Sequence, residues 1–108
     1  MLKKTKRRYL ALEIDSTETI EAKEFMDAVW SVIIRLYGEH GASKTGLTMI
    51  DYNTESKLAL IRVTNAASDI VRAAVATMTK MGGKPVGVHV VAVSGTIRAL
   101  CKRVRQRQ

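Results

Sequence analysis

The side chains best able to do chemistry in this chain are the basic ones at its two ends. The sequence holds 18 Lys and Arg against 10 Asp and Glu, a formal net charge of +8, and ten of the basic residues fall in two terminal segments without acidic residues. These ten are Lys3, Lys4, Lys6, Arg7, Arg8, Arg98, Lys102, Arg103, Arg105 and Arg107. If folding brings these residues together, they form one cationic patch of the kind that binds nucleic acid. The alternative is two solvated basic tails.

A second candidate for anion binding is the turn before the last basic segment. Ser94, Gly95 and Thr96 separate an apolar run from a helical pattern. A helix N-terminus presents unpaired N–H groups, and Gly95 would let a phosphate approach closely. The spacing favours the simpler alternative that Ser94 or Thr96 caps the helix, and the two roles are compatible. The predicted nucleic-acid-binding set is Lys3, Lys4, Lys6, Arg7, Arg8, Ser94, Thr96, Arg98, Lys102, Arg103 and Arg105.

Residues that would carry catalysis or hold a metal are scarce. Cys101 is the only cysteine, so no internal disulfide can form, and no Cys/His cluster has zinc-ligand spacing. His40 and His89 lie in different predicted elements, and no glycine-rich phosphate loop or serine nucleophile motif occurs. The sequence therefore predicts no catalytic residue, bound metal or cofactor in this chain.

The length and composition predict one globular domain over residues 1–108. Hydrophobic residues make up 46% of the chain, but no apolar run approaches the roughly 18 to 20 residues that span a bilayer. No apolar segment follows the basic N-terminus, so we expect no secretory signal. We expect a cytoplasmic protein with no membrane association.

The basic ends must be positioned by the elements between them. The first is a predicted strand over 8–14, where the apolar residues Leu10, Leu12 and Ile14 occupy every second position. Capping oxygens in 15–17 predict a helix whose apolar stripe ends near Gly38. The residues of this predicted stripe are Ala22, Met26, Val29, Trp30, Ile33, Leu36 and Tyr37.

Two strand-like runs, 46–52 and 56–64, are close enough in sequence to form an antiparallel hairpin. A second helix is predicted over 66–81, closed by Gly82-Gly83, and 86–93 forms a last strand. This order predicts an α+β, ferredoxin-like βαββαβ sandwich with two helices on one face of the sheet. The added C-terminal helix would cover the other face and direct its basic side outward.

Modules of this topology often stack RNA bases on aromatic side chains of the two central strands. In this sequence Tyr9 is the only aromatic residue on either of those strands. We therefore expect contacts with phosphates and weak sequence preference.

Four segments resemble the family of archaeal ribonuclease P protein component 2. They are VSGTIRA at 93–99, DIVRAA at 69–74, GEHG at 38–41 with Gly46 following, and RYLAL at 8–12. The first of these is the most specific, and the resemblance extends over nearly the whole chain.

The resemblance implies a protein cofactor of the RNA enzyme that removes 5′ leaders from precursor tRNA. In that family the RNA and its magnesium ions are the catalyst. The implied partners are ribonuclease P RNA, precursor tRNA and ribonuclease P protein component 3, in an assembly with two copies of each protein. The resemblance does not assign individual RNA contacts to residues.

Phe25, Val32 and Ile34 lie off the main stripe of the first helix and are candidates for a protein-partner surface. The alternative is that this helix is buried on more than one side.

Two other functions remain open. One is a structural protein of the ribosome or another ribonucleoprotein, and the other is a regulatory domain that binds a small molecule. In a small phosphate-binding enzyme, Arg62 or Arg72 could act with Asn65, but the pattern gives this little support.

Overall fold

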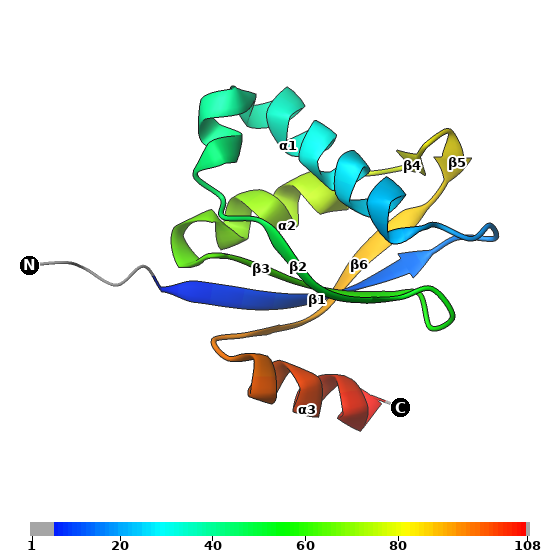
Figure 1. The fold of residues 1–108 in the computed structure, drawn as a ribbon, viewed down its shortest axis with the longest axis vertical. Helices are drawn as coiled ribbons and strands as arrows, with labels where there is room; N and C mark the ends of the chain where they lie inside the picture. The colour runs from blue at the N-terminus through cyan, green and yellow to red at the C-terminus, as the bar shows by residue number, and fades with distance from the viewer. Residues whose placement is uncertain (1–5, 108) are drawn as a thin grey trace, which may run out of the picture.

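A four-stranded antiparallel sheet lies at the centre of the structure, a computed structural model that describes residues 6–107 (Figure 1). The strands are β1 (Arg7–Asp15), β2 (Thr48–Asn53), β3 (Leu58–Thr64) and β6 (Gly87–Ser94). Their spatial order is β2-β3-β1-β6, so the first and third predicted strands are central and the predicted hairpin pairs as expected. The ferredoxin-like arrangement is confirmed.

Two helices cover one face of the sheet, α1 (Ala22–Ser43) and α2 (Ser68–Ala76), the latter entered through a single 3₁₀ turn (Asn65–Ala67) (Figure 1). Successive side chains of a strand point to opposite faces, so alternate residues of β1 point toward these helices. The main core between sheet and helices includes Leu10, Leu12, Ile14, Phe25, Val29, Ile33, Ile61, Val63, Val71 and Val75.

The helix α3 (Ile97–Arg107) lies against the opposite face of the sheet, as predicted (Figure 1). Leu100 is fully buried there in a second cluster with Ala11 of β1 and Leu60 of β3. Ala11 is paired with Ala92 of β6, and these small side chains leave room for the helix to approach the sheet. Further apolar residues packed against this cluster are Tyr9, Leu58, Val91, Ile97, Cys101 and Val104.

The start of α1 differs from the prediction. The helix begins at Ala22, because the residues predicted to cap it form a loop in which the Ser16 hydroxyl is hydrogen-bonded to the backbone of Glu18. The N–H of Glu21 donates to the Glu24 carboxylate at 3.4 Å, one half of a capping box. At the other end, Gly38 interrupts the helix with φ of 77°, and helical backbone resumes up to Ser43.

The buried face of α1 also differs from the predicted stripe. Phe25, Val29 and Ile33 are fully buried and form its core face, at the four-residue spacing of one helical side. The predicted stripe was therefore wrong in part. Three residues of the predicted stripe are exposed to solvent: Trp30 by 39%, Leu36 by 46% and Tyr37 by 40%.

The second helix is shorter than predicted, because it ends at Ala76 rather than at Met81. The strands β4 (Lys80–Met81) and β5 (Lys84–Pro85) pair as a small hairpin instead. Gly82 and Gly83 form its turn with φ of 56° and 82°, values that two-residue hairpin turns require and that glycine adopts without strain.

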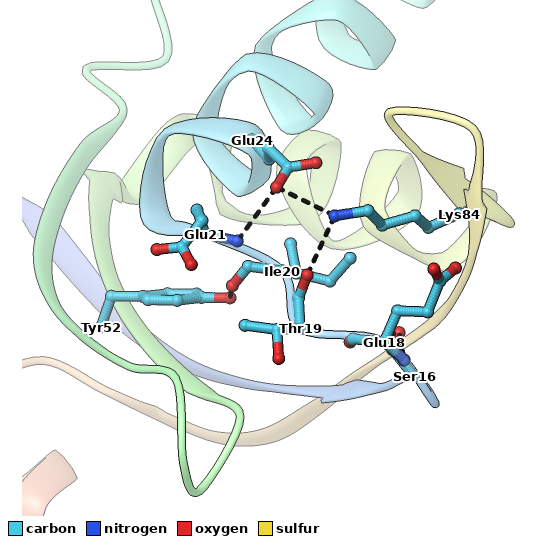
Figure 2. Close-up of polar contacts among 8 residues, drawn as sticks. All are labelled: Ser16, Glu18, Thr19, Ile20, Glu21, Glu24, Tyr52 and Lys84. Atoms are coloured by element: carbon cyan, nitrogen blue, oxygen red, sulfur yellow. Dashed lines mark hydrogen bonds and ion pairs between the residues drawn. The ribbon is translucent and has the colours of Figure 1, made fainter.

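A set of hydrogen bonds ties this hairpin and β2 to the loop before α1 (Figure 2). The Lys84 ammonium donates to the backbone carbonyl of Thr19 at 3.0 Å and to the Glu24 carboxylate at 3.2 Å. The Tyr52 hydroxyl donates to the carbonyl of Ile20. Burial, and then the nearby carboxylates of Glu21 and Glu24, raise the pKa of Tyr52.

The same contacts predict a pH dependence of stability. The hydrogen bond from Lys84, and then the one from the N–H of Glu21, lower the pKa of Glu24 below its ordinary value of 4.5. This contribution to folding is therefore complete above about pH 5 and is lost as the pH falls through the lowered pKa of Glu24. In the Lys84→Met variant we expect the pKa of Glu24 to rise toward 4.5, and the free energy of unfolding to change less between about pH 6 and pH 3.

Carboxyl-carbon NMR titration and urea unfolding at the two pH values measure these effects. Lys80→Met, on the same hairpin, controls for the loss of one charge. An unchanged pKa of Glu24 in Lys84→Met would contradict the assignment.

Candidate nucleic-acid interface

Three elements meet around a surface hollow of about 390 Å³ at one end of the sheet. They are the start of β1, the 3₁₀ turn before α2, and the turn between β6 and α3. Among residues 6–107, those lining the hollow are Lys6, Arg7, Arg8, Asn65 and Gly95. Three of these five residues are cationic and none is acidic, so the hollow is suited to an anion.

The strand register explains why these residues meet. Tyr9 of β1 pairs with Ser94, the last residue of β6, so Arg8 lies beside the turn that leads into α3. A Cβ atom placed on Gly95 would lie 4.0 Å from Nη1 of Arg8. The N-terminal basic run and the start of the terminal helix are therefore neighbours.

Hydrogen bonds fix the hollow on its other side. Nε of Arg8 donates to Oδ1 of Asn65 at 2.8 Å, and the backbone N–H of Asn65 donates to the carbonyl of Lys6 at 2.7 Å. Asn65 thus holds both the backbone and the side chain of the basic run. The side chains of Lys6, Arg7 and Arg8 remain exposed to solvent.

The basic residues of α3 extend this surface away from the hollow. Arg98, Lys102 and Arg105 are exposed, and their spacing of four and three residues places them on one side of the helix. Seven residues of helix rise by about 10 Å, so the stripe spans that length. Nη1 of Arg103 donates to the carbonyl of Val93 at 2.5 Å, a contact that helps to hold α3 against the end of β6.

Ser94 and Thr96 shape the turn. Oγ1 of Thr96 accepts a hydrogen bond from the N–H of Ala99 at 3.2 Å, so Thr96 caps α3. Oγ of Ser94 accepts one from the N–H of Thr96 at 3.4 Å, and Ser94 is buried. The capping alternative is therefore realised. Ser94 therefore offers little side-chain surface to RNA, whereas Thr96 is exposed.

The face of the sheet that would stack bases is covered. The helix α3 lies over it, and Tyr9 packs half-buried against the cluster beneath that helix. This arrangement agrees with a surface that contacts phosphates rather than stacked bases.

The candidates for a protein-partner surface need correction. Phe25 is fully buried in the main core, so its assignment to a partner surface is wrong. Val32 and Ile34 are half-buried and pack against the same core. Trp30, Leu36 and Tyr37, assigned by the sequence to the core, are exposed on this helix. The spacing of seven between Trp30 and Tyr37 puts these two aromatic residues on one side.

The remaining candidates lie elsewhere. Arg72 lines a separate hollow of about 630 Å³ between α2 and β6 with Asp69 and His89, whereas Asn65 lines the basic hollow. Among residues 6–107, no three or more His, Cys, Asp or Glu side chains are grouped to hold a metal ion. No helix in this part of the chain has the length and hydrophobicity to span a membrane. Lys3 and Lys4 lie outside the described residues.

Comparison with known proteins agrees with this architecture. The family model of the Rpp14/Pop5 family matches residues 8–105. The chain is 30% identical over 98 residues to ribonuclease P protein component 2 of Pyrococcus abyssi, covering 91% of this chain and 83% of the relative. It is also 30% identical over 106 residues to the protein of that name from Methanobrevibacter smithii, covering 92% and 88%.

A solved structure shares the fold. A chain in the cryo-EM structure of yeast ribonuclease MRP superposes with a TM-score of 0.72 at 19% identity, over 99% of this chain and 94% of that one. The family model covers residues 8–105, which include β6, the turn at Gly95 and most of α3. The two archaeal relatives each cover about nine tenths of the chain. This chain therefore belongs to the Rpp14/Pop5 family.

Proposed function

We propose that this chain is a non-catalytic protein subunit of ribonuclease P that helps the RNA catalyst to remove 5′ leaders from precursor tRNA. Its relatives carry the name ribonuclease P protein component 2. The observation that carries the proposal is the hollow whose five described lining residues include three cations and no acid, in a chain that belongs to this family.

The chain acts through phosphate contacts. Phosphates of the catalytic RNA are neutralised by Lys6, Arg7 and Arg8 at the hollow and by the exposed basic stripe of α3. These contacts help to hold the RNA in its active shape. Magnesium belongs to the RNA in this proposal, and the chain supplies no ligand to it. The site of action is the cytoplasm.

A second surface meets the partner protein. The partner is ribonuclease P protein component 3, with two copies of each protein in the assembly. The outer side of α1 supplies the contact, because Trp30 and Tyr37 are 39% and 40% exposed there. Large aromatic residues of this kind dominate the binding energy of many protein interfaces.

Affinity purification of the tagged chain from its own cells tests both contacts. We expect it to recover ribonuclease P RNA and component 3, and the Trp30→Ala, Tyr37→Ala double variant to lose component 3 by at least about tenfold. Ile50→Ala is a matched control, since Ile50 is 39% exposed but lies on β2. Recovery of ribosomal RNA and ribosomal proteins instead would support the alternative of a ribosomal protein, and recovery of no RNA would favour a regulatory domain.

A further inference from the structure

We infer that Asn65 is a positioning residue for RNA binding, which holds Arg8 so that the basic hollow takes a phosphate group of the RNA backbone. The inference rests on the proposed function and adds to it a specific subsite. Asn65 lies 57 residues from Arg8 in sequence, yet its side chain is the acceptor for the Nε–H of that arginine at 2.8 Å.

The geometry leaves the rest of the guanidinium available. An arginine side chain has five N–H donors, and the bond to Asn65 uses the one at Nε. Nη1 lies on the side of the hollow that faces Gly95, 4.0 Å from the position a Cβ atom would take there. A forked pair of donors in a fixed orientation is the arrangement that binds a phosphate by two hydrogen bonds.

The group that accepts this hydrogen bond carries no charge. Exposed arginines that are held in place are commonly held by a carboxylate, which cancels their charge. Asn65 accepts the hydrogen bond with a neutral amide oxygen, so Arg8 is oriented and keeps its full attraction for an anion. The backbone N–H of Asn65 also holds the carbonyl of Lys6 at 2.7 Å, which fixes the backbone of the basic run.

Gly95 supplies the space. Its φ lies outside the left-handed region, so the backbone does not require glycine there. A Cβ atom at this position would be in ordinary van der Waals contact with Arg8, and a larger side chain would take up part of the hollow that both residues line.

Prior orientation makes binding more favourable. A free arginine loses rotamer freedom when it contacts a phosphate, and part of this entropic cost is already met when a neighbour holds the side chain. Asn65 therefore contributes to RNA affinity through Arg8 and needs no contact with the RNA itself.

The test compares substitutions that separate orientation from charge. Asn65→Asp keeps an acceptor for Arg8 but adds a negative charge at the hollow, whereas Asn65→Ala removes the acceptor. Asn53→Asp is the matched control, because Asn53 also accepts hydrogen bonds and lies at the opposite end of β2 and β3 from the hollow. Affinity for ribonuclease P RNA is measured with the full chain between about 50 and 300 mM salt, and folding is checked by urea unfolding.

We expect Asn65→Asp to weaken RNA binding about tenfold and to lower the slope of log K against log salt by roughly 0.7 to 0.9. The Asn53→Asp variant should bind with nearly the affinity and slope of the wild-type chain. Asn65→Ala should weaken binding by a smaller factor and leave the slope nearly unchanged. The effect of Asn65→Ala should vanish when Arg8 is already alanine, which a structural role of Asn65 would not produce.

Two outcomes overturn the inference separately from the proposed function. If the wild-type chain binds ribonuclease P RNA but Asn65→Asp binds as Asn53→Asp does, the subsite is wrong and the proposed function stands. The same holds if the effect of Asn65→Ala persists in the Arg8→Ala background. If the wild-type chain does not bind this RNA, both proposals are wrong.

Discussion

Replacing Arg98, Lys102 and Arg105 together by alanine is expected to lower the affinity for ribonuclease P RNA by about a hundredfold or more near 0.1 M salt. The three side chains lie exposed on one side of α3, and each is expected to neutralise one phosphate. Each lost phosphate contact should reduce the slope of log K against log salt by roughly 0.7 to 0.9, so the slope of the triple variant should fall by about 2 to 3.

The fold should survive this change. Alanine has the highest helix propensity, and the buried side of α3, centred on Leu100, is untouched. A variant with Lys23, Arg35 and Lys80 replaced by alanine is the matched control, because it removes three exposed charges outside the proposed interface. Equal losses of affinity in the two triple variants would mean that only net charge matters and would contradict a located interface.

Replacing Phe25 by alanine is expected to cost about 3 to 5 kcal/mol of the free energy of unfolding. Phe25 is fully buried, and its ring packs against that of Tyr52 with the ring centroids 5.6 Å apart. A loss of this size is a large part of the 5 to 15 kcal/mol that stabilises a typical domain, so the variant should be partly unfolded at about 37 °C.

Trp30→Ala provides the contrast for Phe25→Ala. Trp30 is 39% exposed, and we expect its replacement to change the free energy of unfolding by no more than about 1 kcal/mol. Urea unfolding of both variants measures the difference. A larger cost for Trp30→Ala than for Phe25→Ala would show that the predicted stripe was correct and that α1 faces the sheet by another side.

The sheet and the terminal helix were predictable because their signals are local. Leu10, Leu12 and Ile14 alternate with residues of the other face, and the short connection after Asn53 requires an antiparallel hairpin. The apolar side of α3 is equally plain, since Leu100 and Val104 lie one turn apart.

The orientation of α1 was not predictable from its sequence. Apolar residues surround much of the helix, so periodicity allows a stripe through Trp30 as readily as one through Phe25. The side of α1 that is buried is determined by its packing against β1 and against Tyr52 of β2, and this packing depends on the tertiary fold. The Gly82-Gly83 pair was ambiguous for a different reason, because glycine both ends helices and forms two-residue hairpin turns.

The basic hollow was predictable only in part. Clustered charge identified Arg7 and Arg8, and the turn signal identified Gly95. The sequence named Asn65 only as a possible companion of Arg62 or Arg72. Its contact with Arg8 depends on the pairing of β1 with β3, which places the residue after Thr64 beside the start of β1. A neutral residue that orients a charged one across 57 positions leaves no periodic or compositional trace.

The most direct measurement of the central claim is the rate of precursor-tRNA cleavage by reconstituted ribonuclease P with and without this chain. The RNA, the other protein subunits and a magnesium concentration at which they cleave slowly are held constant. We predict that the wild-type chain raises the rate of 5′-leader removal without moving the cleavage site, and that the Arg98, Lys102, Arg105 triple variant restores much less of it. A rate that does not change when the chain is added would contradict the claim.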